Sequence, residues 1–427
     1  MSLSKKQAII SPTGISQLNN DSLKAILFKL PLKSLHRSKC VSKNWNAVGS
    51  EAPVRKPIGI TAGLFYSDVK GKVWGYASSI AGEEYEEDPM ANFDPTLSFL
   101  PCHPHQLIIG ACNGLVLCLE NGNHWLNFYV CNPLTKSWAA VPMPESVGGS
   151  ITYFAAIVFD PSVSPHFKII RFMHRCEGDL ANGEVLQINH YLGEQLLRDP
   201  WYFNPPKEMD IEVFSSETGR WVKSTILHGA RVSCSWLPSL TIDKVLFKLA
   251  NPRHLLRFDL TDNCTPLPEI LLPEDAGCAS YGCLGVSEGF LLFAHCDVLA
   301  LRIWQLRLTN DVGEWDLKHD IPYENLRQLA LQDLGSELGK ISHRPAGFLS
   351  DSEIVFLEGT RVVAYDYNLV RIRRLAGLKP YNVTTGQFKN FVFSPSLHDP
   401  LKILKTGKTE VHDPVKILKT GKTEELD

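Results

Sequence analysis

The apolar positions between residues 18 and 50 follow a helical period. Four of them are spaced i, i+3, i+4 and i+7, which places them on one face of a helix: Leu23, Ile26, Leu27 and Leu30. Asn20 or Asp21 is suited to be the N-cap of this helix, and Pro31 is placed to end it and to open a second one. A third helix is expected from Ser42. Three short helices bury too little surface to be stable alone, so this module needs a partner.

From about Pro57 onward the helical period is nearly absent. Short apolar runs recur instead, separated by Gly, Pro, Asn and Asp, which predicts many short strands and indicates a sandwich, a barrel or a propeller. The one helix expected in this part spans residues 324–334, as an insertion. The alternating helices of a parallel α/β sheet are missing.

A strand, a polar turn and an aromatic residue recur along this part, at 128–138, 211–221, 306–315 and 381–388. The marker residues Thr135, Thr218, Thr261 and Thr309 are separated by 83, 43 and 48 residues. A unit of about 40–50 residues is typical of a four-stranded propeller blade. We therefore predict an α+β multidomain protein: a small all-α module of three short helices, followed by an all-β propeller of six or seven blades. The recurring aromatic residues are expected to pack between adjacent blades.

The N-terminal module resembles a known family, the F-box, a helical motif that docks on a Skp-type adaptor in cullin-based ubiquitin ligases. The matching residues are Ile26-Leu27, Leu30-Pro31, Lys33-Ser34-Leu35, Arg37, Cys40-Val41-Ser42-Lys43 and Trp45. The resemblance implies an adaptor-binding set of Leu18, Ile26, Leu27, Leu30, Pro31, Leu35, Val41 and Trp45. The alternative is that the same apolar residues pack the module onto the following domain, and Trp45 is also suited to the core of the module.

The β-rich part resembles the F-box-associated, kelch-like region of the large plant F-box families. The matching segments are IIGACNGLVLC at 108–118, NPLTKSW at 132–138, FDPSVSPHFKIIRF at 159–172 and LRIWQL at 301–306. Together the two resemblances imply a non-catalytic, substrate-recognition subunit of an SCF-type (Skp–cullin–F-box) ubiquitin ligase. Its partners would be a Skp-type adaptor, a cullin through that adaptor, and a protein target held by the propeller. The alternative is a propeller interaction scaffold without a ligase connection.

One loop is a candidate for target binding. The segment RDPWYFNPP at 198–206 brings together Trp201, Tyr202 and Phe203, and aromatic side chains often anchor protein interfaces. The alternative is that these three side chains are buried between blades.

The sequence matches the motifs of covalent catalysis and phosphate binding only in part. Gly285–Gly289 matches G-x-S-x-G, but a strand follows it, whereas a nucleophile elbow needs a helix there. We therefore predict a hairpin turn, equivalent to the one at Asn113-Gly114. Gly407-Lys408-Thr409 resembles the end of a phosphate-binding loop, but Lys402 stands where that motif requires glycine.

Two groups of residues contain side chains of the types that bind zinc: Cys102, His103 and His105, and then Cys278, Cys283, His295 and Cys296. Neither has the two tight pairs of a structural zinc site, so they are expected to be core or loop residues. No metal and no cofactor are predicted.

The net charge and the cysteine content restrict the possible partners and the cellular compartment of the protein. A net charge of −3 excludes a strong general field for nucleic acid. No secretory signal opens the chain, and its longest apolar runs, such as 284–294, are too short to span a bilayer. The 11 cysteines lack a framework spacing, so we expect reduced thiols in the cytoplasm and/or the nucleus, without membrane contact.

The predicted organisation is a flexible N-terminus at 1–17, the helical module at 18–50, the propeller at 57–395 and a flexible tail at 396–427. The tail carries a tandem duplication. HDPLKILKTGKTE at 398–410 returns as HDPVKILKTGKTE at 412–424, with Leu401 replaced by Val415. Each copy is too short for a repeat domain.

Overall fold

The computed structural model of the 427-residue chain describes part of it. The described residues are 19–27, 38, 41–50, 63–68, 74–78, 93–120, 127–142, 154–174, 208–227, 233–234, 239–251, 253–261, 264–276, 279, 282–334, 345–358, 361–377, 388–394, 396 and 398–406. The chain divides into two compact units. The smaller comprises residues 1–56 with 86–91, and the larger comprises residues 57–85 with 92–427.

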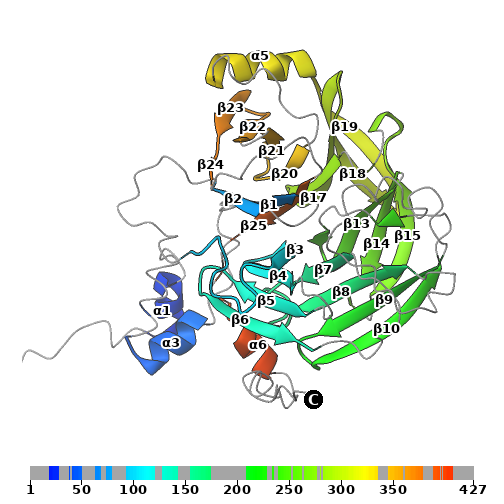
Figure 1. Cartoon of the computed structure of the whole chain (residues 1–427). Helices are drawn as coiled ribbons and strands as arrows, with labels where there is room; N and C mark the ends of the chain where they lie inside the picture. Colours follow the sequence, from blue (N-terminus) through cyan, green and yellow to red (C-terminus); the bar gives the residue numbers. More distant parts are fainter. Residues whose placement is uncertain are drawn as a thin grey trace, which may run out of the picture. The chain divides into compact units, whose positions relative to one another are not determined.

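The larger unit contains six antiparallel sheets, which Figure 1 shows arranged around a common centre. The first three sheets along the chain have the following strands. β3 (Gln106–Cys112), β4 (Leu115–Glu120), β5 (Phe128–Asn132) and β6 (Ser137–Val141) form one. β7 (Phe154–Val158), β8 (Lys168–His174), β9 (Glu208–Ser215) and β10 (Arg220–Leu227) form the next. β11 (Ser233–Cys234), β12 (Leu240–Ile242), β13 (Val245–Asn251), β14 (His254–Asp259) and β15 (Thr265–Leu271) form the third.

The other three sheets follow. β16 (Gly282–Ser287), β17 (Phe290–Cys296), β18 (Ala300–Thr309) and β19 (Val312–Pro322) form the fourth. β20 (Pro345–Phe348), β21 (Glu353–Glu358), β22 (Arg361–Asp366) and β23 (Arg371–Arg374) form the fifth. β1 (Gly63–Asp68), β2 (Trp74–Ser78), β24 (Ala376–Gly377) and β25 (Phe388–Phe393) form the sixth.

The sixth sheet joins the two ends of the larger unit. β1 pairs antiparallel with β25, so that Phe65 lies opposite Phe391, although more than three hundred residues separate them in the sequence. β25 also contacts the first strand of two other sheets, β3 and β20. This pairing closes the ring, because the first and last strands of the propeller lie side by side in one sheet.

Tight turns set the hairpins of these sheets. Asn113-Gly114 joins β3 to β4, and Glu288-Gly289 joins β16 to β17. All four residues have positive φ (44°, 84°, 50° and 84°), as a two-residue type I′ turn requires. The predicted equivalent hairpin turns are confirmed, because each joins the first two strands of its sheet.

Neighbouring sheets pack face to face, and recurring aromatic residues lie between them. Trp221 at the start of β10 donates a hydrogen bond from Nε1 to the Pro142 carbonyl, next to β6 of the preceding sheet (2.6 Å). Trp315 on β19 donates in the same way to Leu271 at the end of β15 (2.9 Å). The expectation that these aromatic residues pack between sheets is confirmed at both positions.

Four α-helices are described: α1 (Asn20–Leu27), α3 (Lys43–Ser50), α5 (Tyr323–Leu334) and α6 (Pro400–Thr406). A 3-10 turn, η2, spans Glu274–Ala276. α5 matches the helix expected at 324–334, and its buried residues Leu326 and Ala330 pack against the fourth and fifth sheets.

The fold class predicted from the sequence is wrong as stated. The described residues of the N-terminal module hold two α-helices instead of three. The larger unit is not all-β, since α5 and α6 belong to it. The six or seven equivalent four-stranded blades are replaced by six unequal sheets, of which one has five strands and one takes strands from both ends. Sequence spacing shows neither feature, because the extra strand β11 is only two residues long and the sheet that takes strands from both ends depends on pairing across a long stretch of chain.

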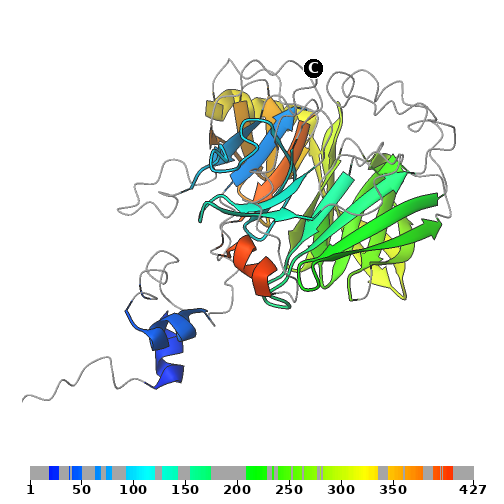
Figure 2. The same cartoon turned by 60° about the horizontal axis from the view of Figure 1, so that its bottom comes forward.

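The tail expected at 396–427 begins inside the packed unit. α6 lies against β5 and β6 (Figure 2). Its Ile403 and Leu404 are buried in the core between the first and second sheets, and Leu401 packs beside them. Residues 398–406 of the first copy are therefore part of the propeller domain.

Candidate functional site

The smaller unit presents a packed pair of helices with local caps. The Asn19 side chain accepts a hydrogen bond from the Ser22 backbone N–H (2.8 Å), which caps α1, and the Ser42 hydroxyl accepts one from the Trp45 N–H (3.1 Å), which caps α3. The cap of α1 is therefore Asn19, one residue before the predicted candidates. The helices bury Leu23, Leu27 and Val48 against each other, with Trp45 partly buried beside them.

The predicted adaptor-binding residues separate into three groups. Ile26 and Val41 are exposed, at 46% and 64% of their surface. Leu27 is fully buried, and Trp45 packs onto the small core, so these two hold the helices together. The remaining four lie outside the described residues: Leu18, Leu30, Pro31 and Leu35.

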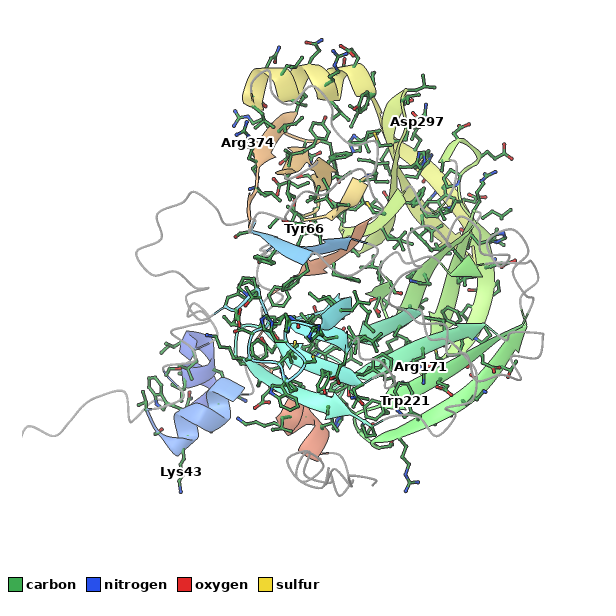
Figure 3. The ribbon with its side chains drawn as sticks, viewed as in Figure 1. Lys43, Tyr66, Arg171, Trp221, Asp297 and Arg374 are labelled. Atoms are coloured by element: carbon green, nitrogen blue, oxygen red, sulfur yellow. The ribbon has the colours of Figure 1, made fainter. Side chains whose placement is uncertain are left out.

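The surface of the helix pair also carries polar residues. The Asn44 side chain donates a hydrogen bond to the Asn20 side chain (3.1 Å), which ties α3 to α1 at the surface. Lys43, the first residue of α3, projects away from the pair (Figure 3). Ile26 on α1 and Val41, two residues before α3, are exposed apolar side chains of this helix pair.

Trp201, Tyr202 and Phe203 lie outside the described residues, in the long connection between β8 and β9. Their role stays a prediction.

The segment with the G-x-S-x-G pattern has the geometry of a hairpin. Gly285 and Ser287 lie on β16, and the chain continues after the turn as strand β17. A nucleophile elbow places its serine between a strand and a helix, so these residues do not form one.

The thiols of the described part are poor nucleophiles. Seven free cysteines are described, and six of them are buried. Burial raises the pKa of Cys112 to about 11 and that of Cys264 to about 12, so both remain protonated at neutral pH. Cys102 is buried while His103 and His105 are exposed. Within the described ranges, no three His, Cys, Asp or Glu side chains gather as a metal site would need.

A buried ion pair stabilises the second sheet. Arg171 on β8 contacts Glu212 on β9 at 2.8 Å, and both side chains are almost wholly buried. The Arg171 guanidinium lies 5.7 Å from the ring centre of Trp221 and 5.8 Å from that of Phe128 in the first sheet (Figure 3). Burial lowers the pKa of Arg171, and the Glu212 carboxylate opposes that shift. The ion pair lies within the second sheet, and the cation–π contact with Phe128 joins that sheet to the first.

A side chain that the sequence analysis overlooked joins the C-terminal segment to the first sheet. Asn132 is fully buried and donates from Nδ2 to the Ser396 and His398 carbonyls, both at 2.8 Å. Its Oδ1 accepts from the Leu134 N–H (2.9 Å). A helix signal was available at Asp399-Pro400, because aspartate is a strong N-cap and proline is favoured at the first helical position.

Among the residues that the structure describes, no helix is long and apolar enough to cross a membrane. The predicted cytoplasmic or nuclear location stays a prediction.

The described part of the chain comprises a small helical module with exposed apolar side chains and a β-propeller. Residues 15–52 match the model of the F-box domain. The chain therefore contains an F-box domain and a β-propeller, and it is similar to plant F-box proteins.

Two relatives from Arabidopsis thaliana support this conclusion. F-box protein At3g26010 is 24% identical over 78% of this chain and 72% of its own length. Putative F-box/kelch-repeat protein At4g22430 is 23% identical over 69% of this chain and 67% of its own. Matches to two further Arabidopsis F-box proteins cover 44% and 40% of those relatives. Among solved structures, TolB from Acinetobacter baumannii is 8% identical over 82% of this chain and 72% of its own. Its TM-score of 0.40 is too low to support an argument.

An F-box followed by a propeller is the organisation of substrate adaptors of SCF-type ubiquitin ligases in general. Such proteins are non-catalytic: the F-box binds a Skp-type adaptor, and the propeller binds targets.

Proposed function

We propose that this chain is a substrate-recognition subunit of an SCF-type ubiquitin ligase. Its helical module docks a Skp-type adaptor, the adaptor links it to a cullin, and the propeller holds a protein target. Other subunits transfer ubiquitin. The contribution of this chain is to position the target, which raises the effective concentration of its lysines at the transfer site.

The observation that carries the proposal is the coincidence of the F-box match with two exposed apolar side chains. Leu23 and Leu27 close the small core of the module, whereas Ile26, on the same helix, is 46% exposed. Val41, immediately before the cap of α3, is 64% exposed. Burial of one aliphatic side chain in an interface contributes about 1–3 kcal/mol. We assign Ile26 and Val41 to direct contact with the adaptor, together with Leu18, Leu30, Pro31 and Leu35.

Leu27 and Trp45 receive a different role in this proposal. Their packing against Leu23 and Val48 holds α1 and α3 together, so they act on docking by shaping the module. Removal of either side chain is expected to unfold the module, whereas a change at Ile26 or Val41 is expected to leave it folded.

The target is expected to bind the loops of the propeller, because loops on a rigid scaffold commonly carry recognition. We assign Trp201, Tyr202 and Phe203 as anchors. Replacement of all three by alanine is expected to remove the target from material captured with the full chain, while the Skp-type adaptor is still captured. Retention of every captured protein would contradict this assignment.

Co-purification tests the docking step. The full chain, co-expressed with a Skp-type adaptor, is expected to purify with it in equal amounts. The Ile26→Asp, Val41→Asp double variant is expected to lose the adaptor. Val163→Asp is a matched control, because Val163 is a comparably exposed valine (57%) in the larger unit. A wild-type chain that purifies without the adaptor would favour the alternative, an interaction scaffold outside the ligase.

A further inference from the structure

The contact between α6 and the first sheet involves residues that occur twice in this chain. α6 buries Ile403 and Leu404 in the core between the first and second sheets, with Leu401 packed beside them. Residues 412–424 repeat the sequence of residues 398–410 with a single difference, Val415 in place of Leu401. Every other side chain that makes the contact therefore has an identical counterpart 14 residues later.

The capping of α6 is duplicated as well. Asp399 Oδ1 accepts hydrogen bonds from the Leu401 N–H (3.0 Å) and the Lys402 N–H (3.4 Å), and Pro400 occupies the first helical position. Asp413 and Pro414 supply the same pair in the second copy. An aspartate N-cap followed by proline sets the start of a helix locally, so the second copy contains the same start signal as the first.

The sheet recognises the segment through groups that both copies offer. Asn132 donates to the His398 carbonyl, a backbone group that His412 also supplies. The ring of Phe159 meets the His398 ring edge-on, with centres 5.0 Å apart. His412 repeats that imidazole. The one difference, at Leu401, concerns a side chain that is only partly buried.

We propose that the surface of β5 and β6 under α6 is a peptide-binding site for the motif His-Asp-Pro-aliphatic-Lys-Ile-Leu-Lys. Residues 398–406 and residues 412–420 of the same chain compete for it. Only one copy occupies the site at a time. The first is favoured, because docking of the second copy loops out the 14 residues between His398 and Val411. Loop closure costs about fiftyfold for that length, and the methylene missing at Val415 about fourfold more.

Deletion of residues 398–411 tests the fit of the second copy directly. The deletion joins Leu397 to His412, so the second copy follows Ser396 at the same distance as the first copy does now. We expect this variant to keep the thermal midpoint of the full chain to within about 1 °C. A chain that ends at Leu397 is the control, with an expected midpoint about 5 °C lower.

Point variants test the exchange in the full-length chain. Ile403→Asp with Leu404→Asp disables the first copy, and Ile417→Asp with Leu418→Asp disables the second as a matched control. We expect the second pair alone to change nothing. The first pair is expected to slow amide hydrogen exchange of residues 412–420 by about threefold. The quadruple variant is expected to lose that protection and to have the lowest midpoint.

Two results would overturn the proposal. One is a 398–411 deletion that is as unstable as the chain ending at Leu397, because the second copy would then not fit the site. The other is a quadruple variant whose midpoint equals that of the Ile403→Asp, Leu404→Asp variant, because the second copy would then contribute nothing in the full chain.

Discussion

Replacement of Asn132 by alanine is expected to cost more than the loss of an ordinary turn residue. Asn132 ends the third strand of its sheet, and its Oδ1 accepts the Leu134 N–H within the following turn. Its Nδ2 reaches outside the turn, to the Ser396 and His398 carbonyls at 2.8 Å. One buried residue therefore closes a local turn and holds the C-terminal segment against the first sheet.

The magnitude follows from these hydrogen bonds. A hydrogen bond contributes about 1 kcal/mol net, and a buried acceptor left without its donor costs about 1–3 kcal/mol. Asn132→Ala removes the bond within the turn and leaves two carbonyls without this donor. We expect the free energy of unfolding to fall by about 3 kcal/mol.

Asp366 offers a matched control. It ends the third strand of the fifth sheet, and its Oδ1 accepts the Asn368 and Leu369 N–H groups at 2.9 and 3.0 Å. These contacts are all local. We expect Asp366→Ala to cost about 1 kcal/mol. The difference of about 2 kcal/mol between the two variants is then the contribution of the contacts to the C-terminal segment.

Urea unfolding followed by tryptophan fluorescence measures both losses. In a chain that ends at Phe393, Asn132→Ala is expected to cost no more than Asp366→Ala, because the two carbonyl acceptors are gone. Equal losses for the two variants in the full-length chain would refute the reasoning.

Three further results are expected. Glu212→Leu should lower the free energy of unfolding by about 3 kcal/mol or more, and adding Arg171→Met should restore part of it; a double variant less stable than Glu212→Leu in urea unfolding would contradict this. Burial lowers the pKa of His295, so the folded protein resists its protonation and the thermal midpoint should fall as pH drops through about 6.5. His295→Gln should reduce the decrease of the thermal midpoint with falling pH, and an unchanged pH dependence in this variant would contradict the prediction. Cys264 and Cys296, which are both buried, should be alkylated at about pH 8 at least ~100-fold more slowly in the native protein than in urea; similar rates by peptide mass spectrometry would contradict this burial.

Short-range sequence patterns predicted the elements whose structure depends on neighbouring residues. The i, i+3, i+4 spacing indicated α1, and the turn dipeptides at Asn113-Gly114 and Glu288-Gly289 indicated two hairpins that the structure contains. These features depend on neighbouring residues only. The pairing of β1 with β25 could not be predicted, because no short-range signal joins segments so far apart.

The sequence also predicted the candidate site only in part. The F-box resemblance identified apolar positions in the helical module, but periodicity alone did not separate Ile26, which is exposed, from Leu27, which is buried. Ile26 and Leu27 lie in the same turn of α1, and the position of α3 determines which of the two side chains is buried. The docking of α6 was missed because its segment was interpreted as tail sequence, despite the start signal at Asp399-Pro400.

The most direct test of the account is the affinity of the purified full chain for a purified Skp-type adaptor, measured by calorimetric titration. We expect the wild-type chain and Val163→Asp to bind with the same dissociation constant, below about 1 μM. The Ile26→Asp, Val41→Asp double variant is expected to bind at least about 100-fold more weakly, because two apolar contacts are lost. A wild-type chain that does not bind, or a double variant that binds as tightly as wild type, would contradict the assignment of this surface.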